Sequence, residues 1–139
     1  MKLTRRDALT LAGAGLAATA LPGALWADAA TDAIAAFTGG ATPGTGGLTL
    51  TAPEIAENGN TVPVSVDAPG ATAIAVFATG NPTPAVATFT FGPAAGSQMA
   101  ATRIRLSKTQ DVLAIAKMAD GSFVQASSTV KVTIGGCGG

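Results

Sequence analysis

Most of the chain after residue 47 alternates between apolar and polar residues with a period of two, which predicts β-strands. In one run Val62, Val64 and Val66 share a face, and in another Ile74 and Val76 oppose Phe77. The runs with this pattern are 48–52, 61–66, 72–78, 85–91, 103–107, 122–127 and 128–134. Each is short enough to be a single strand of a small sheet protein.

Residues 110–118, with the sequence QDVLAIAKM, are apolar on nearly both faces. Leu, Ala, Lys and Met also favour helices, so a helix is the alternative interpretation. The run Val112, Leu113 and Ile115, with the turn ADG directly after it, favours a central strand.

Turn sequences separate the predicted strands: ENGN, APG, GNPTP, GPAAGS and ADGS. Seven or eight short strands joined in this way predict an all-β fold, an antiparallel β-sandwich of immunoglobulin-like size. Residues 48–134 form this predicted domain. Before it, 29–37 read as a short N-terminal helix and 38–47 as a linker, so that 30–47 precede the sandwich.

The first 29 residues have the three parts of a secretory signal. Arg5 and Arg6 belong to a basic stretch, an apolar run covers 8–21, and the small residues of 27–29 fit a cleavage site. The apolar run is shorter than the roughly 20 residues that span a bilayer. A membrane anchor is therefore the less favoured alternative, and we expect no anchor in the mature form.

The stretch TRRDAL, 4–9, is similar to the twin-arginine export motif, in which an arginine pair precedes a modestly hydrophobic run. It departs from the usual pattern at Ala8, where phenylalanine is common, and at Thr10, where lysine is common. Because the arginine pair is intact, we expect export of the folded protein to the periplasm by this route.

Composition excludes several classes of function. The chain is 47% hydrophobic and 12% charged, which indicates a globular domain. It has no basic run, so the electrostatic pattern of nucleic-acid binding is missing. It has no histidine and one cysteine, so we expect no metal site, no cofactor and no catalytic residue.

The one cysteine, Cys137, stands in the terminal sequence GGCGG, between Gly135 and Gly136 before it and Gly138 and Gly139 after it. Glycine has no Cβ and adopts both signs of φ, so 135–139 predict a flexible Gly-rich arm. We expect Gly136 and Gly138 to be sensitive to added side chains and Gly135 to tolerate alanine better.

An exposed thiol in an oxidising compartment has more than one interpretation. It can link two chains by a disulfide, which would make the protein a secreted structural or interaction β-sandwich, or it can be a tail without a role. It can also carry a substrate covalently. With no histidine to activate the thiolate, a carrier would depend on visiting enzymes. Four flanking glycines favour the carrier.

Three stretches resemble the SoxY family, the sulfur-carrier subunit of the periplasmic Sox thiosulfate-oxidising system. They are APEIAENGNTVPVSV (52–66), TRIRLSKTQDVLAIAKMADGS (102–122) and the terminal GGCGG. The resemblance implies an immunoglobulin-like sandwich that pairs with a second sandwich subunit, SoxZ, as a heterodimer. It also implies a non-enzymatic role in which Cys137 carries thiosulfate-derived intermediates.

The same resemblance implies the partner enzymes. In the family, the haem enzyme SoxXA joins thiosulfate to the cysteine, and SoxB releases the terminal sulfonate as sulfate. In some organisms a sulfur dehydrogenase oxidises the remaining sulfane. SoxZ-like partners carry no signal of their own, which agrees with export as a folded complex.

Overall fold

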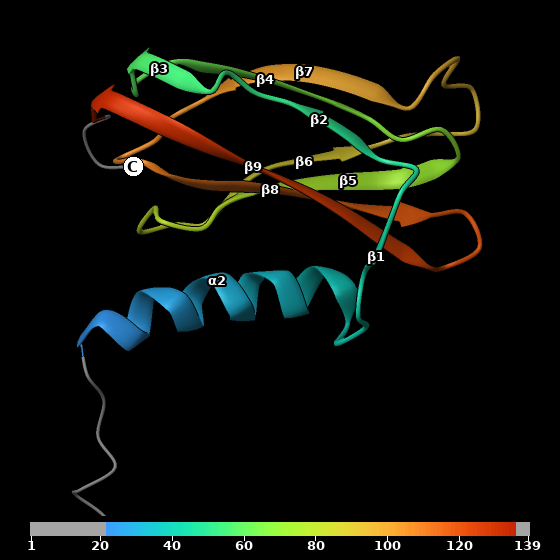
Figure 1. The fold of residues 1–139 in the computed structure, drawn as a ribbon. Coiled ribbons are helices and arrows are strands. Elements are labelled where there is room, and N and C mark those ends of the chain that lie inside the picture. The colour runs from blue at the N-terminus through green and yellow to red at the C-terminus, as the bar shows by residue number, and fades with distance from the viewer. Residues whose placement is uncertain (1–21, 136–139) are drawn as a thin grey trace, which may run out of the picture.

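Two β-sheets face each other, and one helix covers the outer face of the larger sheet (Figure 1). The structure is a computed structural model that describes residues 22–135. It confirms the predicted all-β sandwich with a short N-terminal helix. Among the described residues, no helix is long and apolar enough to cross a membrane.

The strands follow the helix in the chain. Their bounds are β1 (Gly44–Thr45), β2 (Thr49–Thr51), β3 (Ile55–Asn58), β4 (Val62–Asp67), β5 (Ala71–Ala78), β6 (Ala85–Thr90), β7 (Met99–Ile104), β8 (Gln110–Met118) and β9 (Phe123–Ile134). The larger sheet has the order β1-β9-β8-β5-β6, with β3 also paired to β9, and the smaller sheet has the order β2-β4-β7. The stretch 110–118 is thus a strand inside the larger sheet, as predicted.

The period-two pattern becomes the core between the sheets. Val62, Val64 and Val66 of β4 are buried, and the residues that alternate with them, Pro63, Ser65 and Asp67, are more exposed. Across the sandwich the three valines meet Ile74 and Val76 of β5. Full burial of such a side chain contributes about 1.5–3 kcal/mol to folding, so this alternation explains why the two sheets pack.

Helix α2 (Pro22–Thr38) packs on the opposite face of the larger sheet. Its Phe37 makes edge-to-face contacts with Phe77, at a centroid distance of 6.3 Å, and with Phe123, at 5.8 Å. Phe77 therefore faces the helix while Ile74 and Val76 face the core, so that they lie on opposite faces as predicted. The helix ends at Thr38, and the next residue, Gly39, has a positive φ of 67°, which suits a residue without Cβ.

The helix is longer than expected, because it begins at Pro22 rather than at residue 29. It therefore runs across the predicted cleavage site at 27–29. The helix residues packed on the sheet, Ala33, Ile34 and Phe37, all lie after that site. Cleavage there would leave the packed part of the helix in the mature chain.

Three predictions about strands are wrong. The runs 122–127 and 128–134 form the single strand β9, and β7 ends at Ile104 instead of covering 103–107. The structure also adds β1 and β3, which both pair in parallel with β9, so the sandwich is not wholly antiparallel. The pairing of β3 with β9 matters most, because it determines where the chain leaves the sandwich.

Candidate functional site at the end of β9

The sequence places the candidate chemistry at the two ends of the chain, and the structure describes little of either end. Cys137, Gly136, Gly138 and Gly139 lie outside the described residues, as do Arg5 and Arg6. Gly135 is the one predicted site residue within them. Of the predicted arm, the structure therefore describes only the beginning, at Gly135.

We call this place the arm root and define it as Ile134 and Gly135. Ile134 lies in register with Asn58 of the parallel strand β3. The N–H of Gly59 donates to the Ile134 carbonyl at 2.7 Å, and the Leu106 N–H donates to the Gly59 carbonyl at 2.7 Å. These hydrogen bonds tie the end of β9 to two other backbone segments.

Gly135 lies against the segment between β7 and β8. A Cβ on Gly135 would overlap the backbone carbonyl of Ser107. A backbone carbonyl cannot move aside as the end of a flexible side chain can, so the position has no room for a side chain. Alanine at Gly135 should therefore strain the fold, which argues against tolerance at this position, while Gly136 and Gly138 lie outside the described residues.

The buried side chain of Asn81 fixes the β7–β8 segment in turn. Its Nδ2 donates to the Arg105 carbonyl at 2.7 Å. Its Oδ1 accepts from the Ser107 N–H at 3.0 Å, the Ser107 hydroxyl at 3.1 Å and Gln110 Nε2 at 2.9 Å. Gln110 Oε1 then accepts from the Gly80 N–H at 2.9 Å. One amide therefore holds both sides of the loop that Gly135 contacts.

Sequence reasoning missed this network. Asn81 stands in the turn sequence GNPTP, where an asparagine side chain is expected to hydrogen-bond its own nearby backbone, but its exposed fraction is 0% and its partners are distant in sequence. A polar side chain that is fully buried must find hydrogen-bond partners, and among the described residues no buried side-chain polar atom lacks one. No local signal distinguishes this asparagine from an ordinary turn residue.

The residues around the arm root fix the backbone at the end of β9 and supply no reactive group. The residues that hold it act through backbone and amide groups, and none is ionisable: Asn58, Gly59, Asn81, Leu106, Ser107 and Gln110. Within the part of the chain that the structure describes, no group of three His, Cys, Asp or Glu residues could hold a metal ion. These six residues include no base that could activate a thiol.

Comparison with known proteins gives a family match over most of the chain. The family "Sulfur oxidation protein SoxY" matches residues 34–137, so the matched region runs from helix α2 to Cys137. A solved structure, the sulfur carrier protein SoxY from Chlorobium limicola f. thiosulfatophilum, is 36% identical. The alignment covers 79% of this chain and 96% of that one, with a TM-score of 0.68.

Two further structures share the fold alone. A superoxide reductase (neelaredoxin) from Ignicoccus hospitalis is 19% identical over 66% of this chain and 82% of its own, with a TM-score of 0.55. A putative superoxide reductase from Thermotoga maritima is 18% identical over 61% and 84%, with a TM-score of 0.52. A search among curated proteins found no match.

Proposed function

Because this chain belongs to the SoxY family of sulfur oxidation proteins, we propose that it is a periplasmic sulfur carrier that holds thiosulfate-derived intermediates covalently on Cys137. A carrier role in sulfur oxidation follows from the family, whose Chlorobium member is a sulfur carrier protein. The attachment residue, the compartment and the visiting enzymes are the parts that we add.

One observation carries the assignment of Cys137. The family match extends to this residue, which is the only cysteine of the chain. The arm root supports it, because backbone hydrogen bonds hold the fold as far as Ile134, three residues before the thiol. A thiol on a short glycine tether next to a fixed root can be offered to several enzymes in turn.

The chemistry proceeds in two balanced steps. The Cys137 thiolate and thiosulfate form a new sulfur–sulfur bond, giving Cys137–S–S–SO₃⁻, while a haem-containing partner of the SoxXA type accepts two electrons. Water then attacks the terminal sulfonate sulfur under catalysis by a SoxB-type hydrolase. The sulfur–sulfur bond to that sulfonate breaks, hydrogen sulfate leaves, and Cys137 keeps a persulfide, Cys137–S–SH.

Both steps depend on partners, since a free cysteine thiol with a pKa near 8.5 is only a few per cent ionised at neutral pH. The chain has no histidine that could act as a base. The protein is therefore a carrier and not an enzyme in this proposal. A sulfur dehydrogenase is the candidate for the oxidation of the persulfide.

A SoxZ-like sandwich subunit is the proposed stable partner. The twin-arginine-type signal supports this, because that route exports folded proteins and a partner without its own signal can travel in the complex. After removal of residues 1–29 the chain has a net charge of −1 from five basic and six acidic residues, so global charge does not select the partner.

The test is thiosulfate-dependent electron transfer in a system reconstituted with the partner enzymes. Cys137→Ser keeps the size of the side chain but removes the ionisable thiol, so we expect electron transfer to stop while thermal stability stays unchanged. The matched control is Ser97→Ala, a change of similar size in an exposed loop. Electron transfer at the wild-type rate in Cys137→Ser would refute the assignment.

A further inference from the structure

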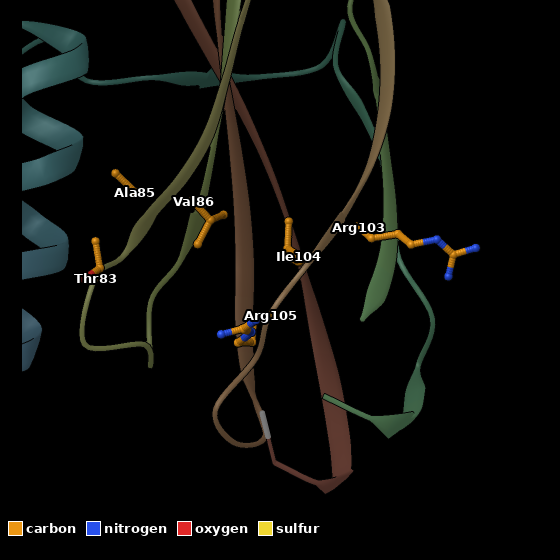
Figure 2. A pocket seen from close by; sticks show the side chains of 6 residues that line it. All are labelled: Thr83, Ala85, Val86, Arg103, Ile104 and Arg105. Carbon is orange, nitrogen blue, oxygen red and sulfur yellow. The ribbon is translucent and has the colours of Figure 1, made fainter. Parts of the chain in front are cut away.

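Strand β7 ends the smaller sheet at an edge that no other described strand covers. The sheet has the order β2-β4-β7, so β7 pairs with β4 on one side and is free on the other. A hollow of about 320 Å³ lies beside this edge, between the start of β6 and the end of β7 (Figure 2). A free edge presents unpaired N–H and C=O groups, and another strand can pair with them.

The other edges of the two sheets are shorter or irregular. β2, at the second edge of the smaller sheet, has three residues, and β1 and β3, beside β9 in the larger sheet, have two and four. β6 has six residues, but its pairing with β5 shifts register, and such an irregularity hinders further pairing. β7 also has six residues, pairs with β4 without a shift and contains no proline. It is therefore the edge best suited to accept a strand.

The hydrogen-bond pattern identifies the backbone groups on the free edge of β7. The Ala68 N–H donates to the Gln98 carbonyl, directly beyond the paired part of β4 and β7. Antiparallel residue pairs alternate between those that exchange hydrogen bonds and those that do not. Counted along the register from this bond, Met99, Ala101 and Arg103 belong to the pairs that do not. The N–H and C=O groups of these three residues therefore point to the free edge.

The side chains of the same three residues lie on the outer face of the sheet. Ala100 and Ile104, which alternate with them, pack in the core between the sheets, so Met99, Ala101 and Arg103 point the other way. Met99 is 57% exposed. Figure 2 shows the guanidinium of Arg103 pointing away from Ile104. The edge thus combines free backbone groups with an exposed apolar side chain and an exposed cation.

A second β7 fits this edge in an antiparallel register centred on Ala101. With Ala101 opposite Ala101 of the second copy, Met99 of each copy lies opposite Arg103 of the other. All three residues with free backbone groups then have partners, and each pair exchanges two N–H···O bonds. The arrangement has two-fold symmetry, the commonest symmetry of protein dimers. It extends the smaller sheet to the order β2-β4-β7-β7-β4-β2.

The charges of the two copies are complementary in this register. Asp67 of β4 is the cross-strand neighbour of Met99. Arg103 of the second copy, opposite Met99, is then two strands from Asp67, at a Cα separation of about 10 Å. Its long side chain can cover the exposed Met99 and reach the carboxylate. Within the part of the chain that the structure describes, neither Asp67 nor Arg103 has an ion-pair partner, and the symmetry gives each of them one.

We propose that β7 is a dimerisation edge, which pairs with β7 of a second copy of this chain in the register centred on Ala101. The proposal is independent of the function proposed above and uses described residues alone. The contact consists of one strand from each copy and two symmetry-related ion pairs. It is smaller than a standard protein interface, so the dimer should be weak and should depend on protein concentration.

The first test uses the mature chain with Cys137→Ser, in which no disulfide can link two copies. Amide hydrogen exchange is measured by NMR at low and high protein concentration. The amides of Met99, Ala101 and Arg103 should exchange more slowly as the concentration rises, whereas the amide of Thr102, which bonds to β4, should be protected throughout. Exchange of the three amides that is independent of concentration would overturn the proposal. Protection that appears only with an added SoxZ-like subunit would also overturn it, because the edge would then serve another partner.

The second test reverses the charges in the same background. Arg103→Asp places like charges together at two symmetry-related sites, so the dissociation constant of the dimer, measured by sedimentation, should rise roughly tenfold. Arg103→Asp combined with Asp67→Arg restores both ion pairs with reversed sign and should recover the original constant. Lys131→Asp, an exposed change on β9, is the control and should leave it unchanged. Equal weakening by Arg103→Asp and Lys131→Asp, or no recovery in the double variant, would contradict this pairing.

Discussion

The backbone carbonyl of Ser107 occupies the space that a side chain on Gly135 would need. This contact joins the end of β9 to the segment between β7 and β8, and it marks Gly135 as a packing residue. The role of glycine thus changes within the terminal motif, because Gly135 is required for close approach of two backbones. Conformational freedom remains the prediction for the glycines around Cys137.

Gly135→Ala should therefore destabilise the fold. Overpacking of this kind costs about 1–3 kcal/mol, and it should weaken the hydrogen bond from the Gly59 N–H to Ile134. Chemical denaturation gives the free energy of unfolding, and amide hydrogen exchange at Gly59 reports the root directly. Gly92→Ala is the control, because a Cβ there meets nothing within 4 Å. Equal stabilities for the two variants would contradict the packing role.

Asn81→Ala should be more damaging than its place in a turn suggests. It removes the acceptor of the Ser107 N–H and the donor to the Arg105 carbonyl. The Ser107 hydroxyl and Gln110 Nε2 lose the same acceptor but keep the Gly80 and Lys108 carbonyls. Each unsatisfied buried group costs about 1–3 kcal/mol, so we expect the free energy of unfolding to fall by at least about 2 kcal/mol. Gln98→Ala, which loses an exposed hydrogen bond to the Gly70 N–H, should cost under about 1 kcal/mol. A similarly small loss for Asn81→Ala would be inconsistent with the network.

The β8–β9 turn should contribute to acid sensitivity through Asp120. Hydrogen bonds from the Ser122 hydroxyl and N–H lower the pKa of this carboxyl from its ordinary value of 3.8. A lowered pKa means that the charged form stabilises the folded state, so the contribution is complete above pH 3.8 and is lost as the pH falls through the folded-state value. The melting temperatures of wild type and Asp120→Ala should therefore converge as the pH drops below 3.8. A difference in melting temperature between the two proteins that stays constant until Asp120 is fully protonated would contradict this.

The export prediction concerns Arg5 and Arg6. Replacing both by lysine keeps the charge but removes the pair that the twin-arginine translocase recognises. We expect the precursor to accumulate in the cytoplasm, measured by fractionation and immunoblotting. Lys2→Arg is the control, since it changes a basic residue outside the pair. Normal periplasmic accumulation of the double variant would rule out this route.

The sequence predicted correctly which face of a strand a side chain occupies, because this depends only on the neighbouring residues of the same strand. The alternation of Val62, Val64 and Val66 predicts their common inward face, and Phe77 opposes its neighbours because it meets the helix. Such patterns are local, since successive side chains of a strand point to opposite faces. The class of fold follows from their number and from the turns between them.

Elements that depend on distant partners were not predictable in this way. β3 has one buried residue, Ala56, and exists because it pairs with β9. β9 continues through the polar residues Ser127 and Ser128 because β8 supplies a continuous hydrogen-bonding partner. The burial of Asn81 depends on the β7–β8 segment folding over it. The same holds for the candidate site. The sequence GGCGG is enough to single out the thiol, but the contact between Ser107 and Gly135 joins distant parts of the chain and could not be predicted from it.

The central claim is that Cys137 carries sulfur covalently, and the most direct test is the intact mass of the mature protein. It would be purified without reductant from cells that are oxidising thiosulfate. The account predicts a monomer mass with added thiosulfate or sulfane sulfur, which reductant removes and which Cys137→Ser lacks. A mass equal to two chains joined by a disulfide, with no adduct on any monomer, would contradict the account and favour a structural role for the cysteine.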